Sequence, residues 1–243
     1  MKKLFIITGT SKGLGFELAT SALRLNHQVL GISRESKIRH PLYAHLKLDL
    51  KNPKNLTKKI EDYLKKNFHK KFSEVILINN AAMVEPINFA GKISEENLKE
   101  HFQLNFFTPI AIMNLVKKIY EKKSEKIIIC NLSSGAALRA IPNWSAYCAS
   151  KAALKMYTDT LMEEATDESH LLAFSFNPGV MDTGMQATIR KQDAKKFVRV
   201  ADFIDLKENK KLRPPKEVAE KLIELINTPE KIKTTMISIN ELN

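Results

Sequence analysis

The chain has 243 residues, a length typical of one α/β domain, so we expect a single domain over residues 1–243. Hydrophobic residues make up 44% and charged residues 27%, which excludes a wholly disordered protein. The net charge is +12, but the lysines are scattered over polar faces without interleaved aromatic residues, so we expect binding of anionic ligands and no nucleic-acid binding. No apolar run approaches the ~18 residues of a membrane span, and the first one is too short for a secretory signal. We therefore expect a cytoplasmic protein without a membrane segment, and no metal site.

Short apolar runs alternate with longer segments of helical periodicity. This alternation predicts an α/β fold with a doubly wound, seven-stranded parallel sheet and helices on both faces. The predicted strands are 3–8, 28–33, 45–49, 75–79, 126–132, 171–177 and 235–239. The predicted helices are 13–25, 53–68, 94–120 with a break near Pro109, 145–165 and 215–226.

The segment 181–213 departs from this alternation. It is polar, rich in lysine and irregular in pattern, and Pro214 and Pro215 follow it. Long segments without clear regular structure in a compact domain are usually lids or binding loops. We therefore predict that 181–213 is a substrate-binding loop or lid.

A glycine-rich turn, Gly9–Gly15, follows the first predicted strand and opens the first predicted helix. In that position glycines let the backbone approach a pyrophosphate, and the helix N-terminus supplies amide donors. An ordinary tight turn is the alternative. After the second strand, Ser33 and Arg34 offer a hydroxyl and a guanidinium suited to a 2′-phosphate, which favours NADPH. Glu35, one position later, leaves NADH open as the alternative.

Tyr147 and Lys151 lie four residues apart, a spacing that places a phenol and an ammonium on one face of a helix. A tyrosine has an ordinary pKa of about 10, and roughly 4 kcal/mol of preferential stabilisation of the phenolate brings it near neutral pH. A neighbouring cation with hydrogen bonds can supply that energy. The pair indicates a proton-transferring tyrosine, and a tyrosine that only fills a helix interface is the alternative.

Several segments, taken in chain order, resemble the short-chain dehydrogenase/reductase family over almost the whole chain. They are the glycine turn, Asn79–Ala82, Asn105, Asn131–Ser134, and Tyr147 with Lys151. The resemblance implies a Rossmann-like fold and an NADP(H)-dependent oxidoreductase acting on a carbonyl or hydroxyl group. Within the family, residues 144–148 and 177–186 look most like those of members that reduce benzil to (S)-benzoin, and of sepiapterin reductases.

The resemblance also implies four catalytic residues. Tyr147 would give a proton to the carbonyl oxygen, Ser134 would donate a hydrogen bond to it, and Lys151 would lower the tyrosine pKa and hold the nicotinamide ribose. Asn105 would anchor a water that relays protons through Lys151. Ser134 is preferred to Ser133 because it lies thirteen residues before Tyr147, the usual interval in the family. Structural roles for Ser134 as a turn cap and for Asn105 as a backbone bridge stay open.

The resemblance also implies the remaining coenzyme contacts. Asp49 and Leu50 would flank the adenine, Thr183 would bond the carboxamide, and Lys12 and Arg34 would pair with the 2′-phosphate. Ala82 stands where the family commonly has glycine. The full set of expected contacts is Gly9, Ser11, Lys12, Gly13, Leu14, Gly15, Ser33, Arg34, Asp49, Leu50, Asn80, Ala81, Ala82, Tyr147, Lys151, Pro178, Gly179, Val180 and Thr183.

Apolar and aromatic residues near the catalytic positions predict a flat, apolar carbonyl substrate such as an α-diketone. Methionines among them adapt to aromatic surfaces. The expected substrate contacts are Ser134, Ala136, Leu138, Trp144, Tyr147, Met181 and Met185, with Val84 and Ile141 as further candidates.

Two other functions stay open, and the sequence also bears on the oligomeric state. Sepiapterin is the weaker substrate, because Ser238 stands where pterin-reducing relatives carry a carboxylate, and Glu241 is the nearest acid. A catalytically silent dinucleotide-binding scaffold is the second alternative. Relatives often pair through the helix that bears Tyr147, and the small residues Ala146, Ala149, Ala152 and Ala153 permit close contact there, so we expect a homodimer.

Overall fold

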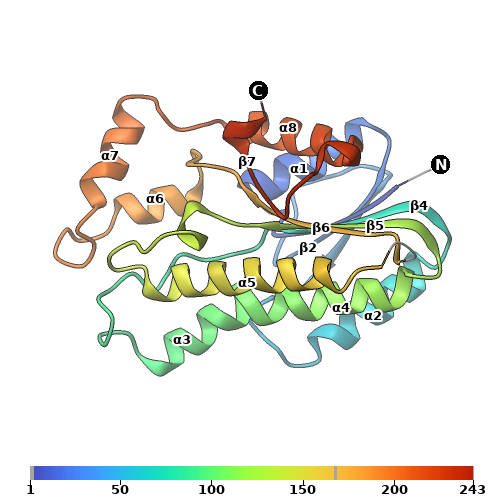
Figure 1. The fold of residues 1–243 in the computed structure, drawn as a ribbon, viewed down its shortest axis with the longest axis horizontal. Coiled ribbons are helices and arrows are strands. Elements are labelled where there is room, and N and C mark those ends of the chain that lie inside the picture. The colour runs from blue at the N-terminus through green and yellow to red at the C-terminus, as the bar shows by residue number, and fades with distance from the viewer. Residues whose placement is uncertain (1–2, 167–168, 243) are drawn as a thin grey trace.

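A seven-stranded, all-parallel sheet forms the centre of the computed structural model, which describes residues 3–166 and 169–242 (Figure 1). The strand order is β3-β2-β1-β4-β5-β6-β7, so the chain winds outward from β1 on one side and then from β4 on the other. This reversal places a crevice at the carboxyl ends of β1 and β4, where doubly wound sheets bind ligands. The strands are β1 (Leu4–Thr8), β2 (Gln28–Ser33), β3 (Tyr43–Lys47), β4 (Phe72–Asn79), β5 (Ser124–Leu132), β6 (Leu171–Asn177) and β7 (Met236–Ser238).

Helices cover both faces of the sheet. Helices α1 (Gly13–Arg24) and α8 (Pro215–Asn227) pack on one face, and α2, α4 and α5 lie on the other (Figure 1). Alternate residues of β1 divide between the two buried cores, because successive side chains of a strand point to opposite faces. The other helices are α2 (Leu56–Asn67), α3 (Glu95–Phe102), α4 (Thr108–Tyr120), α5 (Ser145–Glu163), α6 (Gly184–Arg190) and α7 (Val200–Glu208).

The predicted fold class is confirmed, and all seven predicted strands are present. The largest shift concerns β3, which spans Tyr43–Lys47 where residues 45–49 were predicted. Its limits follow from pairing with β2, since Tyr43 pairs with Val29 and Lys47 pairs with Ser33, the last residue of β2. Pairing across the sheet therefore decides where this edge strand ends.

The predicted helix over 94–120 is interrupted six residues before Pro109. A π-helical turn, Gln103–Phe107, separates α3 from α4. Pro109 follows this turn within a continuous run of helix, so its missing N–H and its ring disturb the turn around Asn105, four residues earlier. The break thus belongs to the wider π turn, a feature often found at functional sites.

The segment 181–213 contains two short helices that its polar pattern did not reveal. Thr183 caps α6 by accepting a hydrogen bond from the Gln186 amide, and a β-bridge between Met181 and Arg213 closes the base of the segment. Burial of Phe197 and Val200 against Trp144 and Tyr147 holds α6 and α7 over one end of the sheet. Helix formation here depends on tertiary packing, which cannot be predicted from the local pattern of a short polar segment.

Within 3–166 and 169–242, no helix combines the length and apolar character that crossing a bilayer requires. The same part of the chain holds no group of three or more His, Cys, Asp or Glu side chains arranged to bind a metal.

Candidate active site

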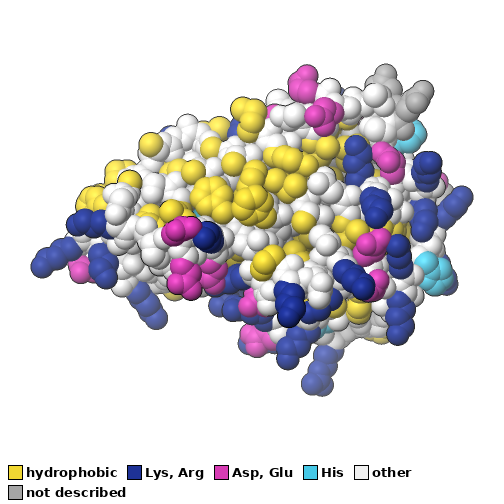
Figure 2. Space-filling view, turned by 90° about the horizontal axis from the view of Figure 1, so that it is seen from below, with side chains coloured by type: hydrophobic (Ala, Val, Ile, Leu, Met, Phe, Trp, Pro, Cys, Tyr) yellow, Lys and Arg dark blue, Asp and Glu magenta, His cyan; other side chains and the backbone are white. Residues whose placement is uncertain are grey.

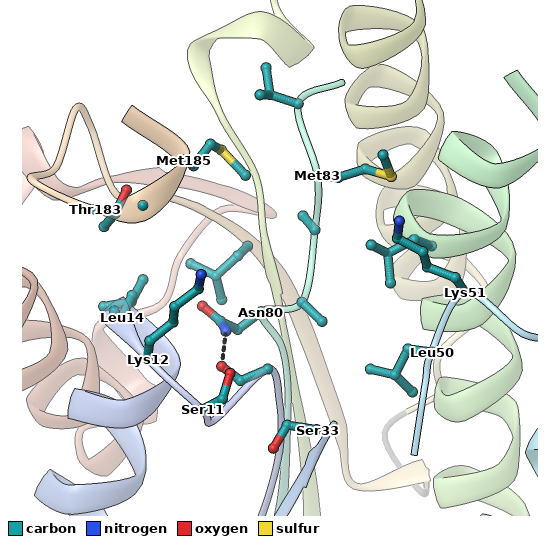
Figure 3. A pocket seen from close by; sticks show the side chains of 18 of the residues that line it. Ser11, Lys12, Leu14, Ser33, Leu50, Lys51, Asn80, Met83, Thr183 and Met185 are labelled. Atoms are coloured by element: carbon teal, nitrogen blue, oxygen red, sulfur yellow. Dashed lines mark hydrogen bonds between the residues drawn. The ribbon is translucent and has the colours of Figure 1, made fainter. Parts of the chain in front are cut away.

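A cleft of about 430 Å³ lies at the carboxyl ends of β1, β2, β4 and β5 (Figure 3). Its walls come from the glycine turn, the end of β2, the loop after β4, α5 and the start of the 181–213 segment. The position agrees with the crevice expected from the strand order. The predicted site residues that line it are Gly9, Ser11, Lys12, Gly13, Leu14, Ser33, Arg34, Asp49, Leu50, Asn80, Ala81, Ala82, Val84, Tyr147, Lys151, Pro178, Met181, Thr183 and Met185.

The glycine turn packs closely enough to need glycine at several positions. Gly9 and Gly13 have φ values of +76° and +60°, in the left-handed region. A Cβ on Gly15 would lie 2.3 Å from the Gly9 carbonyl oxygen, so Gly15 supports the turn from beneath and does not line the cleft. The Asn80 side chain donates to the carbonyl oxygen of Gly9 at 3.2 Å (Figure 3). It also donates to the carbonyl oxygen of Thr8 at 2.8 Å. This cradle fits the pyrophosphate of a dinucleotide.

The end of β2 presents a cation to the cleft. Arg34 lines the cleft, whereas the exposed Glu35 does not. The Ser33 hydroxyl donates to the Glu35 carbonyl oxygen at 2.7 Å and lies 3.2 Å from the Thr10 hydroxyl. Because that hydroxyl is committed within the protein, Arg34 is the group at this end that is suited to a phosphate. Lys12 lines the cleft from the glycine turn (Figure 3).

Tyr147 and Lys151 lie together on α5 and are almost fully buried at the wall of the cleft. Burial raises the pKa of Tyr147 to about 12, and a hydrogen bond with the Ser134 hydroxyl acts in the opposite direction. The Lys151 ammonium donates to the Leu132 carbonyl oxygen at 2.6 Å and lies 5.8 Å from the centroid of the Tyr147 ring. The tyrosine pKa is thus shifted in the direction opposite to the expected one, because burial of the phenol outweighs the effect of its neighbours.

The buried Lys151 ammonium makes the stability of the protein depend on pH. Burial lowers the pKa of Lys151 to about 8 from 10.5, so between these values the unfolded chain binds a proton that the folded chain does not. The stability that this group contributes above pH 10.5 is therefore lost as the pH falls from 10.5 to about 8, and it is regained as the pH rises over the same range. We expect the free energy of unfolding, relative to Lys151→Met, to increase by about 2 kcal/mol from about pH 8 to pH 10.

Urea unfolding of both proteins at the two pH values measures this difference. Lys58→Met, a change at an exposed lysine of α2, is the control and should follow the parent protein. Identical pH dependence of the parent and Lys151→Met would show that Lys151 is as easily protonated in the folded chain as in the unfolded one.

The other two predicted catalytic residues do not line the cleft. Ser134 accepts a hydrogen bond from the Ala136 amide at 3.2 Å and contacts Tyr147. Asn105 is buried in the π turn, where its side chain accepts from the Met83 amide at 2.9 Å and donates to the Met83 carbonyl oxygen at 2.8 Å. The structure therefore brings Ser134 into contact with Tyr147. Asn105 is buried and is hydrogen-bonded to Met83 in the loop after β4.

The expected substrate residues divide into two groups. Met181 and Met185 line the cleft at its Tyr147 end together with Val84. Trp144 is buried and stacks on Phe197, with ring centroids 5.3 Å apart and planes 3° apart, so it supports this end from behind. The expected residues that do not line the cleft are Gly15, Asn105, Ser134, Ala136, Leu138, Ile141, Trp144, Gly179 and Val180.

Sequence reasoning missed some of the lining. Ser133 lines the cleft with a buried hydroxyl that has no hydrogen-bond partner among the described residues, and its position beside Ser134 was the available signal. Glu85 and Thr188 line the substrate end without a pattern that would have marked them. The other missed residues are Ile32, Leu48, Lys51, Met83, Leu104, Leu132 and Gly184, most of them neighbours of expected contacts.

Comparison with known proteins identifies the family. The family model described as short chain dehydrogenase matches residues 3–194. The chain belongs to this family. The resemblance indicated by the motifs is therefore confirmed, and the protein is an oxidoreductase of a family that uses nicotinamide dinucleotides.

Individual relatives agree with this assignment. A benzil reductase ((S)-benzoin forming) of Bacillus subtilis is 39% identical over 226 residues, covering 92% of this chain and 93% of the relative. A benzil reductase of Bacillus cereus is 34% identical, covering 97% and 98%. A solved short-chain dehydrogenase/reductase from Saccharomyces cerevisiae has a TM-score of 0.84 at 23% identity and covers 98% of this chain and 96% of that chain, which shows the fold alone.

Proposed function

We propose that this short-chain dehydrogenase is an NADPH-dependent carbonyl reductase that acts on an α-diketone or a similar aromatic ketone, in the manner of benzil reduction to (S)-benzoin. The observation that carries the proposal is one cleft with a buried Tyr147 and Lys151 at its apolar end and Arg34 at the other. The similarity to two benzil reductases supports the substrate class.

The residues around Tyr147 suit proton donation. Because burial raises the pKa of Tyr147 to about 12, its hydroxyl is protonated at neutral pH, the form needed to give a proton to a carbonyl oxygen. The Ser134 oxygen accepts from the Ala136 amide and its hydroxyl is hydrogen-bonded with Tyr147, so the Ser134 proton lies beside the Tyr147 hydroxyl and can donate towards the same carbonyl oxygen. The Lys151 cation stabilises the phenolate as its proton leaves. NADPH, when bound, supplies the hydride.

The coenzyme preference follows from the walls of the cleft at the end of β2. Arg34 is suited to a 2′-phosphate, and Lys12 adds a second cation from the glycine turn. Glu35, the residue that left NADH open, is exposed outside the cleft lining. NADPH is therefore the proposed coenzyme, held by the expected contacts that line the cleft.

The proposed substrate class follows from the residues at the Tyr147 end of the cleft. Val84, Met181 and Met185 form apolar walls beside Tyr147, and methionine adapts to flat aromatic surfaces. We assign 181–213 as the lid over this end, because α6 and α7 are held there by the stacking of Phe197 on Trp144. Such a lid excludes water from the reacting carbonyl.

The decisive experiment incubates the purified protein with NADPH or NADH and a panel of benzil, other α-diketones, quinones and sepiapterin. We expect the oxidation of NADPH, followed as the loss of its absorbance, to be fastest with benzil or another diketone. Faster turnover of sepiapterin would establish the alternative substrate. Coenzyme binding without oxidation by any member of the panel would establish a silent dinucleotide-binding scaffold.

We also propose a homodimer in which α5 of one copy packs against α5 of the other. The face below the sheet in Figure 1 carries an apolar area (Figure 2). Phe107 of the π turn and Met156 of α5 are 56% and 64% exposed. Ala152 of α5 is exposed, whereas Ala146 is buried within its own chain. Exposed apolar area on a helix surface of this kind marks an interface.

Light scattering tests the pairing. We expect a particle of twice the 27.6 kDa chain mass, and we expect Met156→Asp with Phe107→Asp to reduce it to a single chain, since a charge buried at a symmetric interface is repeated across the axis. Leu25→Asp, at an exposed apolar residue at the end of α1, is the control that should leave the mass unchanged. A parent protein that scatters as one chain would disprove the dimer.

A further inference from the structure

His101 is a fully buried residue of α3, one helical turn before Asn105, to which sequence reasoning gave no role. Its Nδ1 atom lies 2.6 Å from the Glu85 carbonyl oxygen. Its Nε2 atom lies 3.0 Å from the Asn105 side-chain nitrogen and 2.9 Å from the Ser150 hydroxyl. The ring therefore joins three segments that wall or support the cleft, namely the loop after β4, the π turn and α5.

These contacts determine the protonation of the ring. A carbonyl oxygen only accepts, so Nδ1 of His101 must carry the proton that it shares with Glu85. In the neutral ring Nε2 then accepts from the Asn105 side chain, whereas a proton on Nε2 would face that amide nitrogen. Burial, together with the nearby Lys151 ammonium, lowers the pKa of His101 and favours this neutral form.

The titratable groups around His101 come from two neighbouring elements. Helix α5 contributes Lys151 and Tyr147, whose ring meets the imidazole edge to face with centroids 6.3 Å apart. The loop after β4 contributes Glu85, which reaches the ring through its backbone carbonyl. Its own helix α3 carries Glu100, which pairs with Lys51 at 2.6 Å.

Both ends of the ring lead to the catalytic region. The Ser150 hydroxyl lies 3.0 Å from the Tyr147 carbonyl oxygen and 2.9 Å from Nε2, so its single proton is shared between these two acceptors, and Ser150 directly precedes Lys151 in the chain. Glu85, on the Nδ1 side, lines the substrate end of the cleft. A single ring thus touches the turn of α5 that carries the proton donor and the wall that faces the substrate.

We propose that His101 is a positioning residue, which as a neutral ring fixes Asn105 and the Tyr147–Lys151 turn through Nε2 and fixes the Glu85 wall of the substrate site through Nδ1. The kinetic consequences of this role rest on the carbonyl reductase function proposed above. Small displacements of catalytic groups carry large penalties in rate, so a buried ring with both nitrogens engaged contributes to turnover without touching the substrate.

Two substitutions separate the two ends of the ring. His101→Asn retains an amide nitrogen near the position of Nδ1 and loses the contacts of Nε2, whereas His101→Gln retains an acceptor near Nε2 and loses the Glu85 contact. We expect His101→Asn to lower kcat by about 10- to 100-fold with little change in the KM of the carbonyl substrate. We expect His101→Gln to keep kcat within about threefold and to raise that KM by about tenfold.

The control is His69→Gln, the same exchange at an exposed histidine beyond α2, which should match the parent protein in both constants. Thermal unfolding and coenzyme titration are run on every variant, so that lost activity in a folded, coenzyme-binding protein is separated from misfolding. The proposed division of roles between the two nitrogens is wrong if both His101 variants keep the parent kcat and KM. It is also wrong if the two variants change kcat by the same factor and KM by the same factor.

Nitrogen NMR of the imidazole tests the structural part without any substrate. We expect His101 to show a protonated Nδ1 and an unprotonated Nε2 from about pH 6 to pH 8. We also expect the backbone amide signals of Asn105 and Lys151 to shift in His101→Asn more than in His101→Gln. A charged ring, or a proton on Nε2 alone, overturns the proposal. A parent protein with the expected tautomer and no carbonyl reductase activity would instead refute the proposed function.

Discussion

Tyr147→Phe is expected to lower the turnover of carbonyl reduction by about 10³-fold or more while leaving NADPH affinity within about twofold. The change removes only the hydroxyl, because the phenyl ring retains its packing against Trp144 and His101, at centroid distances of 5.4 and 6.3 Å. The proposed proton donation to the carbonyl oxygen is then lost, whereas the glycine turn, which we propose as the coenzyme cradle, is unchanged. Steady-state kinetics and a fluorescence titration of the coenzyme measure the two effects.

The same helix offers a matched control. Tyr157 of α5 donates its hydroxyl to the Asn114 side chain at 3.1 Å, away from the cleft, so Tyr157→Phe should retain full turnover. A Tyr147→Phe protein that reduces the substrate at the parent rate would remove Tyr147 as the proton donor and would direct attention to the neighbouring Ser133 and Ser134 hydroxyls.

Arg34→Ala is expected to raise the KM for NADPH by about 100-fold and to change the KM for NADH by less than about threefold. The 2′-phosphate distinguishes the two coenzymes, and Arg34 is the guanidinium that the end of β2 presents to the cleft. Because Ser33 donates its proton to the Glu35 carbonyl oxygen, the serine hydroxyl does not replace the lost guanidinium. Kinetics with both coenzymes at one saturating substrate concentration measure the ratio.

Arg39→Ala is the matched control for this experiment. Arg39 is an exposed arginine of the same loop that does not line the cleft, so the change removes one positive charge from the region and leaves the pocket intact. It should affect the KM for NADPH far less than Arg34→Ala does. Equal effects of Arg34→Ala on NADPH and NADH would mean that the 2′-phosphate lies elsewhere.

The sequence was sufficient for the order of the strands and for the glycine turn that lines the cleft. Buried parallel strands are short and continuously apolar, as in β1 and β4, and the helices between them have a clear period of three to four residues. The glycine turn is local as well, because Gly9 and Gly13 need a backbone conformation that other residues rarely adopt. Tyr147 and Lys151 were found for the same reason, since four residues on one helix place them on one face.

Contacts between distant segments were decided only by the tertiary structure. The burial that raises the Tyr147 pKa, the stacking of Trp144 on Phe197 and the engagement of both His101 nitrogens each join residues that lie far apart in the chain. A short-range pattern carries no information about such contacts. Local conformational preference therefore determined the strands, the long helices and the glycine turn, whereas the pKa values and the packing of α6 and α7 at the Tyr147 end of the cleft arose from burial, which exists only once the chain has folded.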